Sequence, residues 1–203
     1  MGRIIHSYAR AWGWVITRSS GVQVTLSGVD HIDRDRPYIL MANHQGAYDI
    51  FALLAYLPVD FKWLAKAGLF KIPIFGWAMG AAGYISIDRK GKKKALESIE
   101  IAVAKIRGGA SVLVFPEGTR SPDGEIHPFK RGGFTLAIKA GAPIVPISIR
   151  GSREVLPRSS LRVKPGKIEI VVGKPIPTDN KSMADREGLM QEVRAAIEST
   201  FAR

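Results

Sequence analysis

The sequence predicts an α/β fold: a single domain with a mostly parallel central sheet, helices on the faces of the sheet and an antiparallel hairpin near the C-terminus. Short β-rich runs alternate with segments of helical period along the chain, as is typical of parallel strands joined by helices. The 203 residues suit one domain, and no linker divides them. Apolar residues make up 46% of the chain and no segment is repetitive, so the composition excludes disordered and solenoid proteins.

The chain begins with an amphipathic helix, residues 1–20, followed by one domain, residues 21–203. One face of this helix carries Ile4, Tyr8, Ala11, Trp12 and Val15. Such a face suits either a membrane surface or the core of the domain. Strands are predicted at 22–29, 38–43, 61–67, 84–88, 111–115 and 142–151, and helices at 48–57, 92–108, 132–141 and 183–201. We expect a hairpin at 161–176, turning at Pro165 and Gly166.

The net charge of +12 favours polyanions, phosphorylated small molecules or an anionic membrane surface as partners. The chain has no Cys, which excludes disulfides, thiolate metal sites and a Cys nucleophile. His6, His31 and His127 lack metal-ligand spacing, so we expect no metal and no cofactor. The apolar tract 72–87 is shorter than the roughly 20 residues of a membrane span. We therefore expect no transmembrane helix, and the N-terminus does not have the pattern of a signal peptide.

The motif NHQGAYD, residues 43–49, lies where the strand 38–43 ends and the helix 48–57 begins. A carboxylate that accepts a bond from one imidazole nitrogen fixes the tautomer and leaves the other nitrogen free as a general base. The spacing of His44 and Asp49 therefore indicates an acid/base pair. Taken alone, the pattern is more typical of a histidine in an ordinary turn.

A second motif, FPEGTRS (115–121), follows the buried-strand run 111–115. It should emerge at the same edge of the sheet as His44, because sites in such sheets lie outside the carboxyl ends of the strands. Gly118 lets backbone approach a ligand, Arg120 offers a planar fork for a phosphate, and Glu117 can accept bonds from hydroxyls. The alternative is a charged surface turn.

These two motifs occur in order with KAGLFKIPIFG (66–76), which runs on to IDR (87–89), and with IVPI (144–147). In this arrangement the sequence resembles the glycerolipid acyltransferases, specifically the 1-acyl-sn-glycerol-3-phosphate acyltransferases. The resemblance covers about residues 38–150. Many members of that family have Ser where Gly46 stands here.

The resemblance implies that His44, oriented by Asp49, deprotonates the sn-2 hydroxyl of lysophosphatidate as this oxygen attacks an acyl thioester, acyl-CoA or acyl-acyl carrier protein. It implies that Lys66 and Arg120 hold the glycerol phosphate. The substrate-binding residues it implies are Lys66, Arg89, Glu117, Gly118, Thr119 and Arg120, with IVPI beside the acyl donor. The chain has no G-x-S-x-G elbow and no Cys, so the acceptor hydroxyl is itself the nucleophile.

Other functions remain open at this point. The acceptor could instead be glycerol 3-phosphate or another lysophospholipid. The chain could also be a basic lipid-binding or nucleic-acid-binding protein without catalysis, although it lacks RNP, zinc-finger and helix-turn-helix patterns, and we expect no nucleic acid. The basic run 89–94 suits coenzyme A phosphates, lipid headgroups or plain solvent. We expect peripheral attachment to an anionic membrane surface on the cytoplasmic side of the cell membrane.

Overall fold

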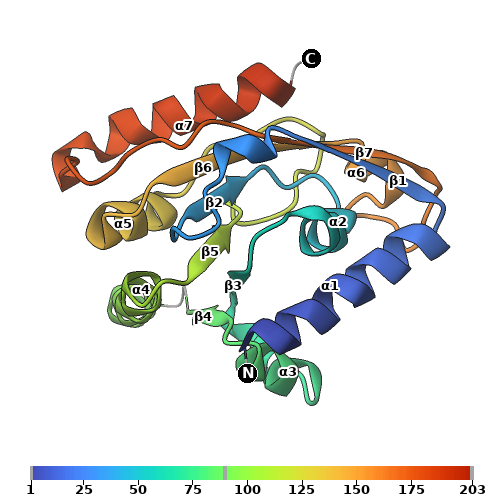
Figure 1. The fold of residues 1–203 in the computed structure, drawn as a ribbon, viewed down its shortest axis with the longest axis horizontal. Coiled ribbons are helices and arrows are strands. Elements are labelled where there is room, and N and C mark those ends of the chain that lie inside the picture. Colours follow the sequence, from blue (N-terminus) through green and yellow to red (C-terminus); the bar gives the residue numbers. More distant parts are fainter. Residues whose placement is uncertain (1, 89–90, 202–203) are drawn as a thin grey trace.

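Seven strands form the sheet at the centre of the computed structural model, in the order β1-β7-β6-β2-β5-β3-β4 (Figure 1). The structure describes residues 2–88 and 91–201. Neighbouring strands are parallel except β6 and β7, which are antiparallel. This confirms the predicted fold class. The strands are Val22–Ser27 (β1), Ile39–Ala42 (β2), Phe61–Lys66 (β3), Ile85–Ile87 (β4), Ser111–Val114 (β5), Ile144–Arg150 (β6) and Gly166–Val172 (β7).

Helices cover both faces of the sheet (Figure 1). One face is covered by α1 and α2, and the other by α4, α5 and α7. The α-helices are Gly2–Ser19 (α1), Tyr48–Tyr56 (α2), Phe75–Ala81 (α3), Lys92–Arg107 (α4), Arg131–Ala140 (α5), Ser152–Val155 (α6) and Arg186–Phe201 (α7). The 3-10 helices are Val29–His31, Ala67–Lys71 and Met183–Asp185. Within the described part of the chain, no helix meets the length and apolar character that crossing a membrane requires.

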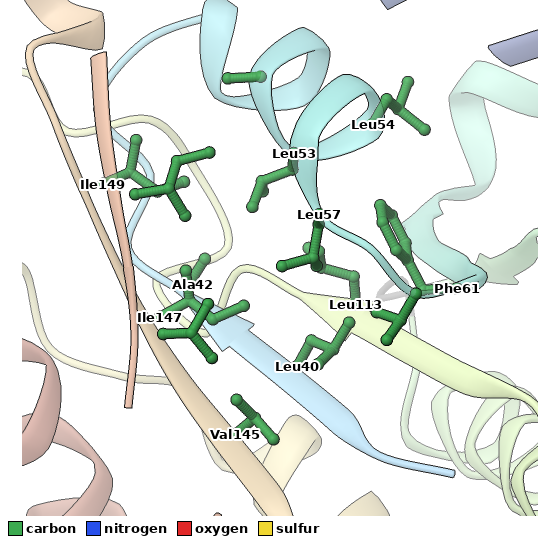
Figure 2. Close-up of a cluster of buried hydrophobic side chains, with 14 of the residues drawn as sticks. Leu40, Ala42, Leu53, Leu54, Leu57, Phe61, Leu113, Val145, Ile147 and Ile149 are labelled. Atoms are coloured by element: carbon green, nitrogen blue, oxygen red, sulfur yellow. The ribbon is translucent and has the colours of Figure 1, made fainter. Parts of the chain in front are cut away.

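Two apolar cores result from the alternation of side chains along the central strands. In β2, Leu40 and Ala42 pack toward α2, while Ile39 and Met41 pack toward α5 and α7. Figure 2 shows the first of these cores, where Leu53 and other α2 side chains lie over the sheet. Because helices cover both faces, β2 (ILMA) is wholly apolar, and β5 (SVLV) is apolar apart from Ser111 at its start.

The antiparallel pairing near the C-terminus is confirmed, but its first strand differs from the one predicted. Residues 161–165 form no strand, and β7 pairs with β6 on one side and with β1 on the other. The predicted turn at Pro165 and Gly166 is instead the point where an irregular segment enters β7. The local sequence correctly indicated a turn before β7, but the strands that pair with β7 come from distant parts of the chain.

The helix α1 contacts the domain through one face that includes Ile16, while several of its large apolar residues face outward. His6, Gly13 and Thr17 are buried, and a Cβ added at Gly13 would lie 2.8 Å from the carbonyl oxygen of Phe51 in α2. Of the face predicted from the sequence, Ile4 is 64% exposed, Tyr8 74%, Trp12 50% and Val15 53%. Trp12 makes an edge contact with the Phe51 ring of α2, with 5.1 Å between centroids, and the rest of this face lies largely in solvent.

Candidate active site

The turn after β2 is held to the neighbouring strand β6 by a buried asparagine. The side-chain nitrogen of Asn43 donates to the carbonyl oxygen of Ile149 at 2.9 Å, and its oxygen accepts from the Ile149 N–H at 2.7 Å. Asn43 is fully buried, so these bonds replace water and fix where the chain leaves the sheet. His44 follows directly, and α2 begins four residues later at Tyr48.

His44 and Asp49 contact each other across this turn, as their spacing predicted. Nδ1 of His44 lies 2.7 Å from Oδ2 of Asp49, and the same oxygen accepts the backbone N–H groups of Gln45 at 2.7 Å and Gly46 at 3.0 Å. The Asp49 side chain is fully buried, whereas the His44 side chain keeps 12% of its surface exposed. With Nδ1 donating to the carboxylate, Nε2 is the nitrogen available to a substrate.

Glu117 braces the same turn from the second motif. Its Oε1 accepts the N–H of His44 at 2.8 Å, and its Oε2 accepts the N–H of His127 at 3.0 Å. The N–H of Ser121 in turn donates to the carbonyl oxygen of His44 at 2.7 Å. Burial raises the pKa of the Glu117 carboxyl, and the two backbone donors oppose that shift. The structure thus brings Glu117 to His44 as a positioning group, while its predicted contact with substrate stays a prediction.

The imidazole of His44 lies flat on an aromatic ring that the sequence analysis did not single out. Its centroid is 3.9 Å from that of Phe115, with 8° between the planes, and Phe115 also stacks on Trp63 at 5.5 Å. Such packing restricts rotation of the imidazole and complements the bond to Asp49. The sequence provided little indication of this stacking, because Phe115 resembles the last residue of an ordinary apolar strand.

A second group missed from the sequence is the side-chain amide of Gln45. The residue is 2% exposed, and neither its side-chain oxygen nor its nitrogen has a partner among the described residues. Oδ1 of Asp49 is likewise buried and unpaired. Buried polar atoms normally have partners, so these two groups beside His44 mark the turn as a site and not a purely structural corner.

The loop after Glu117 is closed by an exposed carboxylate. Oδ1 of Asp123 accepts the N–H of Glu125 at 3.0 Å, the Ser121 hydroxyl at 2.9 Å and Nε2 of His127 at 2.9 Å. These bonds, the Glu125 N–H first, hold the pKa of Asp123 well below its ordinary value. They fix the loop that carries Arg120 at the edge of the sheet.

The other predicted substrate-binding residues that the structure describes lie at the same edge of the sheet. Lys66 ends β3 with an exposed side chain, Thr119 is exposed and Arg120 is half-buried. Gly118 has a φ of 75°, a left-handed conformation that favours glycine. Arg89 lies outside the described residues.

The IVPI block forms the start of β6 and belongs to the cores. Ile144, Val145 and Ile147 are 0% exposed, with Ile144 packed on the α5 side and the other two on the α2 side. Its observed role is to carry the strand that holds Asn43. Contact with an acyl donor stays a prediction.

A cavity of about 450 Å³ lies on the α4 and α5 side of the sheet. His44 is not among its lining residues, but Phe115, whose ring stacks on His44, is one of them. Its lining is mostly apolar: Leu64, Ile87, Gly91, Ala95, Ile99, Val114, Phe115, Pro116, Lys130, Gly132 and Gly133. Its size is that of an ordinary ligand site, about 300–1,000 Å³.

A protein-family model and a solved structure both match this chain. A family model described as Acyltransferase matches residues 23–150. A solved structure, the 1-acyl-sn-glycerophosphate acyltransferase PlsC from Thermotoga maritima, superposes with a TM-score of 0.84 at 28% sequence identity, covering 100% of this chain and 82% of that one.

Curated proteins similar in sequence bear related names. A chloroplastic 1-acyl-sn-glycerol-3-phosphate acyltransferase of Brassica napus is 35% identical over 173 residues, which is 84% of this chain and 50% of the relative. The Homo sapiens alpha enzyme of that name is 34% identical, covering 89% and 64%, and the Pseudomonas aeruginosa protein is 29% identical, covering 98% and 77%. The chain spans about half the length of the plant relatives it matches.

Proposed function

This chain belongs to the acyltransferase family, and on that premise we propose that it acylates the sn-2 hydroxyl of 1-acyl-sn-glycerol 3-phosphate to give phosphatidate. The observation that carries the proposal is the His44–Asp49 pair, held at 2.7 Å with the second imidazole nitrogen directed to substrate. The names of the similar proteins supply the acceptor. The donor is an acyl thioester, carried by coenzyme A or by acyl carrier protein.

The acyl group passes directly from the donor to the acceptor while both substrates are bound. Nε2 of His44 takes the proton of the acceptor hydroxyl while the oxygen attacks the thioester carbonyl carbon. The tetrahedral intermediate then collapses, the carbon–sulfur bond breaks, and the departing thiolate takes the proton from His44. Asp49 stabilises the imidazolium that exists between these two transfers. No acyl-enzyme is needed, since the chain contains no Cys and no serine elbow.

Positioning supplies much of the remaining rate enhancement, because two bound reactants behave as one molecule. Arg120 and Lys66 bind the acceptor phosphate from the rim, since Lys66 is the last residue of β3 and Arg120 lies in the loop after β5. The apolar cavity beside Phe115 takes an acyl chain, with Ala95 and Ile99 of α4 in its wall. In this proposal the thioester carbonyl carbon lies beside His44 and the hydrocarbon chain lies away from water.

The protein attaches peripherally to the cytoplasmic face of the membrane, which holds its lipid acceptor. The exposed apolar face of α1, including Trp12, and the net charge of +12 support this attachment. Amphipathic helices with aromatic residues and flanking cations bind at the headgroup boundary of anionic bilayers.

The test uses purified protein with lysophosphatidate and a panel of acyl thioesters, with products identified by mass. We expect phosphatidate from wild type and none from His44→Ala. Glycerol 3-phosphate and lysophospholipids with larger headgroups serve as competing acceptors, and a preference for one of them would replace lysophosphatidate in the proposal. Incubation with thioester alone should leave the intact protein mass unchanged, whereas a stoichiometric acyl adduct would refute direct transfer.

A further inference from the structure

The segment between α6 and β7, residues 157–165 (PRSSLRVKP), lies on the surface of the domain. Residues 161–165 are all exposed, and Leu161 is 100% exposed, more than any other large apolar residue described. The segment contains Arg158, Arg162 and Lys164 and no acidic residue. Leu161 and the 37%-exposed Val163 thus give this basic segment an apolar tip.

Hydrogen bonds hold this segment in shape. The N–H of Ser160 donates to the carbonyl oxygen of Pro157 at 3.3 Å, that of Arg162 to the Ser160 hydroxyl at 3.0 Å, and that of Lys164 to the carbonyl oxygen of Val155 at 2.9 Å. Leu161 therefore stands at the tip of a closed turn. Its exposure is a feature of the fold and does not come from a frayed strand end.

The base of the segment is bonded to the catalytic turn. The N–H of Ala47, inside the NHQGAYD motif, donates to the carbonyl oxygen of Leu156 at 3.3 Å. Gly46 also packs on this region, since a Cβ there would lie 3.0 Å from the same Leu156 oxygen. A partner that binds residues 157–165 would therefore lie near the turn that carries His44.

The segment also adjoins the end of the amphipathic helix. A Cβ added at Gly21, two residues after α1 ends, would lie 3.2 Å from the Pro165 ring. Figure 1 shows the chain after α6 descending toward the C-terminal end of α1. On α1, Trp14 is 51% exposed, and the guanidinium of Arg18 lies 5.7 Å from its ring. Exposed apolar groups and cations thus continue from α1 onto the segment.

We propose that residues 157–165 form a second membrane-contact element, in which Leu161 enters the headgroup boundary and Arg158, Arg162 and Lys164 bind the phosphates of anionic phospholipids. None of these three cations has an acidic partner among the described residues. Each basic residue near an anionic surface contributes about fivefold in affinity. The proposal rests on the proposed function in that the acceptor is a membrane lipid.

A bilayer fits these observations better than an acidic protein such as an acyl carrier. An acidic helix would pair with the cations but would leave Leu161 and the aromatic face of α1 in water. A bilayer takes both, because apolar tips enter the acyl boundary while cations remain with the headgroups. The contact with Ala47 then sets the active-site rim against the surface from which the acceptor is taken.

A single fluorescent label tests the contact directly, since the chain has no native Cys. The variant Leu161→Cys carries an environment-sensitive nitrobenzoxadiazole group, and Ala195→Cys, exposed on α7, is the matched control. With vesicles containing phosphatidylglycerol we expect blue-shifted, brighter emission at position 161 that shallow spin-labelled lipids quench, and no change at 195. Water-like emission at 161 while the protein sediments with vesicles would overturn the proposal. Emission that changes only with acyl carrier protein would assign the segment to that partner instead.

A kinetic test separates this proposal from the proposed function. We expect Leu161→Asp, and the triple variant Arg158→Ser, Arg162→Ser and Lys164→Ser, to raise the acceptor KM at least tenfold for vesicle-embedded lysophosphatidate. Turnover of a short-chain, dispersed lysophosphatidate should stay at the wild-type level. Equal loss on both acceptors, or no loss on vesicles, would contradict a membrane role. Failure of wild type to use the dispersed acceptor counts against the proposed function, while the label still reports on the segment.

Discussion

Nδ1 of His44 and Oδ2 of Asp49 lie 2.7 Å apart, and the backbone of the same turn donates two further bonds to that oxygen. Asp49 therefore orients the imidazole and also closes the turn that presents it. Any change at Asp49 acts on both the direction of the base and the shape of the loop. Changes at His44 remove the base alone, which makes the two positions separable by experiment.

We expect His44→Ala to lower kcat by about 10²- to 10⁴-fold, the usual contribution of a general base. Asp49→Asn should also be severe, because an amide cannot accept all three donors with a full negative charge and stabilises the imidazolium less. The measurement is steady-state kinetics, with circular dichroism as the check on folding. A folded His44→Ala protein that turns over at a near wild-type rate would exclude His44 as the base.

Gly46 should not tolerate Ser, the residue that many family members have at this position. A Cβ here would lie 2.3 Å from the carbonyl oxygen of Ser152 and would push α6 away from the catalytic turn. Overpacking of this kind costs about 1–3 kcal/mol. We expect Gly46→Ser to lower both the free energy of unfolding, measured by denaturant titration, and kcat/KM. Gly188→Ser, where nothing lies within 4 Å, is the control, and equal stability of the two variants would contradict the packing argument.

Removing either proposed phosphate ligand should affect the acceptor and leave the donor unaffected. A hydrogen bond to a charged group contributes about 1.5–3 kcal/mol, so Arg120→Ala and Lys66→Ala should each lower kcat/KM for lysophosphatidate roughly 10- to 100-fold. The donor KM should stay near wild type when the two substrates are varied separately. Arg107→Ala, exposed at the end of α4, serves as control. Loss of thioester affinity alone would move these residues to the donor site.

Filling the cavity beside Phe115 should change the preferred acyl length. Ala95 lines that cavity, so Ala95→Phe would shorten the space open to a hydrocarbon chain. We expect the preference among saturated thioesters, or among lysophosphatidates of graded chain length, to shift toward shorter chains. Ala104→Phe, exposed on the same helix, should leave the preference unchanged. An unaltered profile in Ala95→Phe would place the acyl chain elsewhere.

Acid should loosen the contact between α1 and the domain through His6. Burial lowers the pKa of His6, an effect that the nearby carboxylate of Asp60 opposes and that Lys62 and Arg10 reinforce. The unfolded chain, with a His pKa of about 6.5, then binds protons more readily than the native protein, so stability falls as pH drops below that value. We expect the melting temperature to fall from pH 7.5 to 5.5 by more in wild type than in His6→Phe. Equal slopes in wild type and His6→Phe would contradict this role.

The sequence by itself determined the central strands and the main helices that cover them, although it also predicted a strand over 161–165 that does not form. Apolar runs such as SVLVF and ILMA specify strands covered on both faces, and the carboxyl ends of parallel strands meet at one edge. His44 and Asp49 could be paired from the sequence because the contact closes within a single turn. Their neighbour Glu117 could be placed at the same edge, since it follows a strand of the same sheet.

Only the tertiary structure decided the partners that lie far apart in the chain. β7 pairs with β6 and β1, and Asn43 bonds to Ile149, 106 residues away. Gly46 packs closely against Ser152. The two carboxylate oxygens of Glu117 accept the backbone N–H groups of His44 and His127. Local pattern encodes the face that a residue buries, but not the element that comes to cover it, because that choice depends on packing and loop closure over the whole domain. For the same reason, the sequence showed the apolar face of α1, and only the fold showed that the domain leaves it exposed.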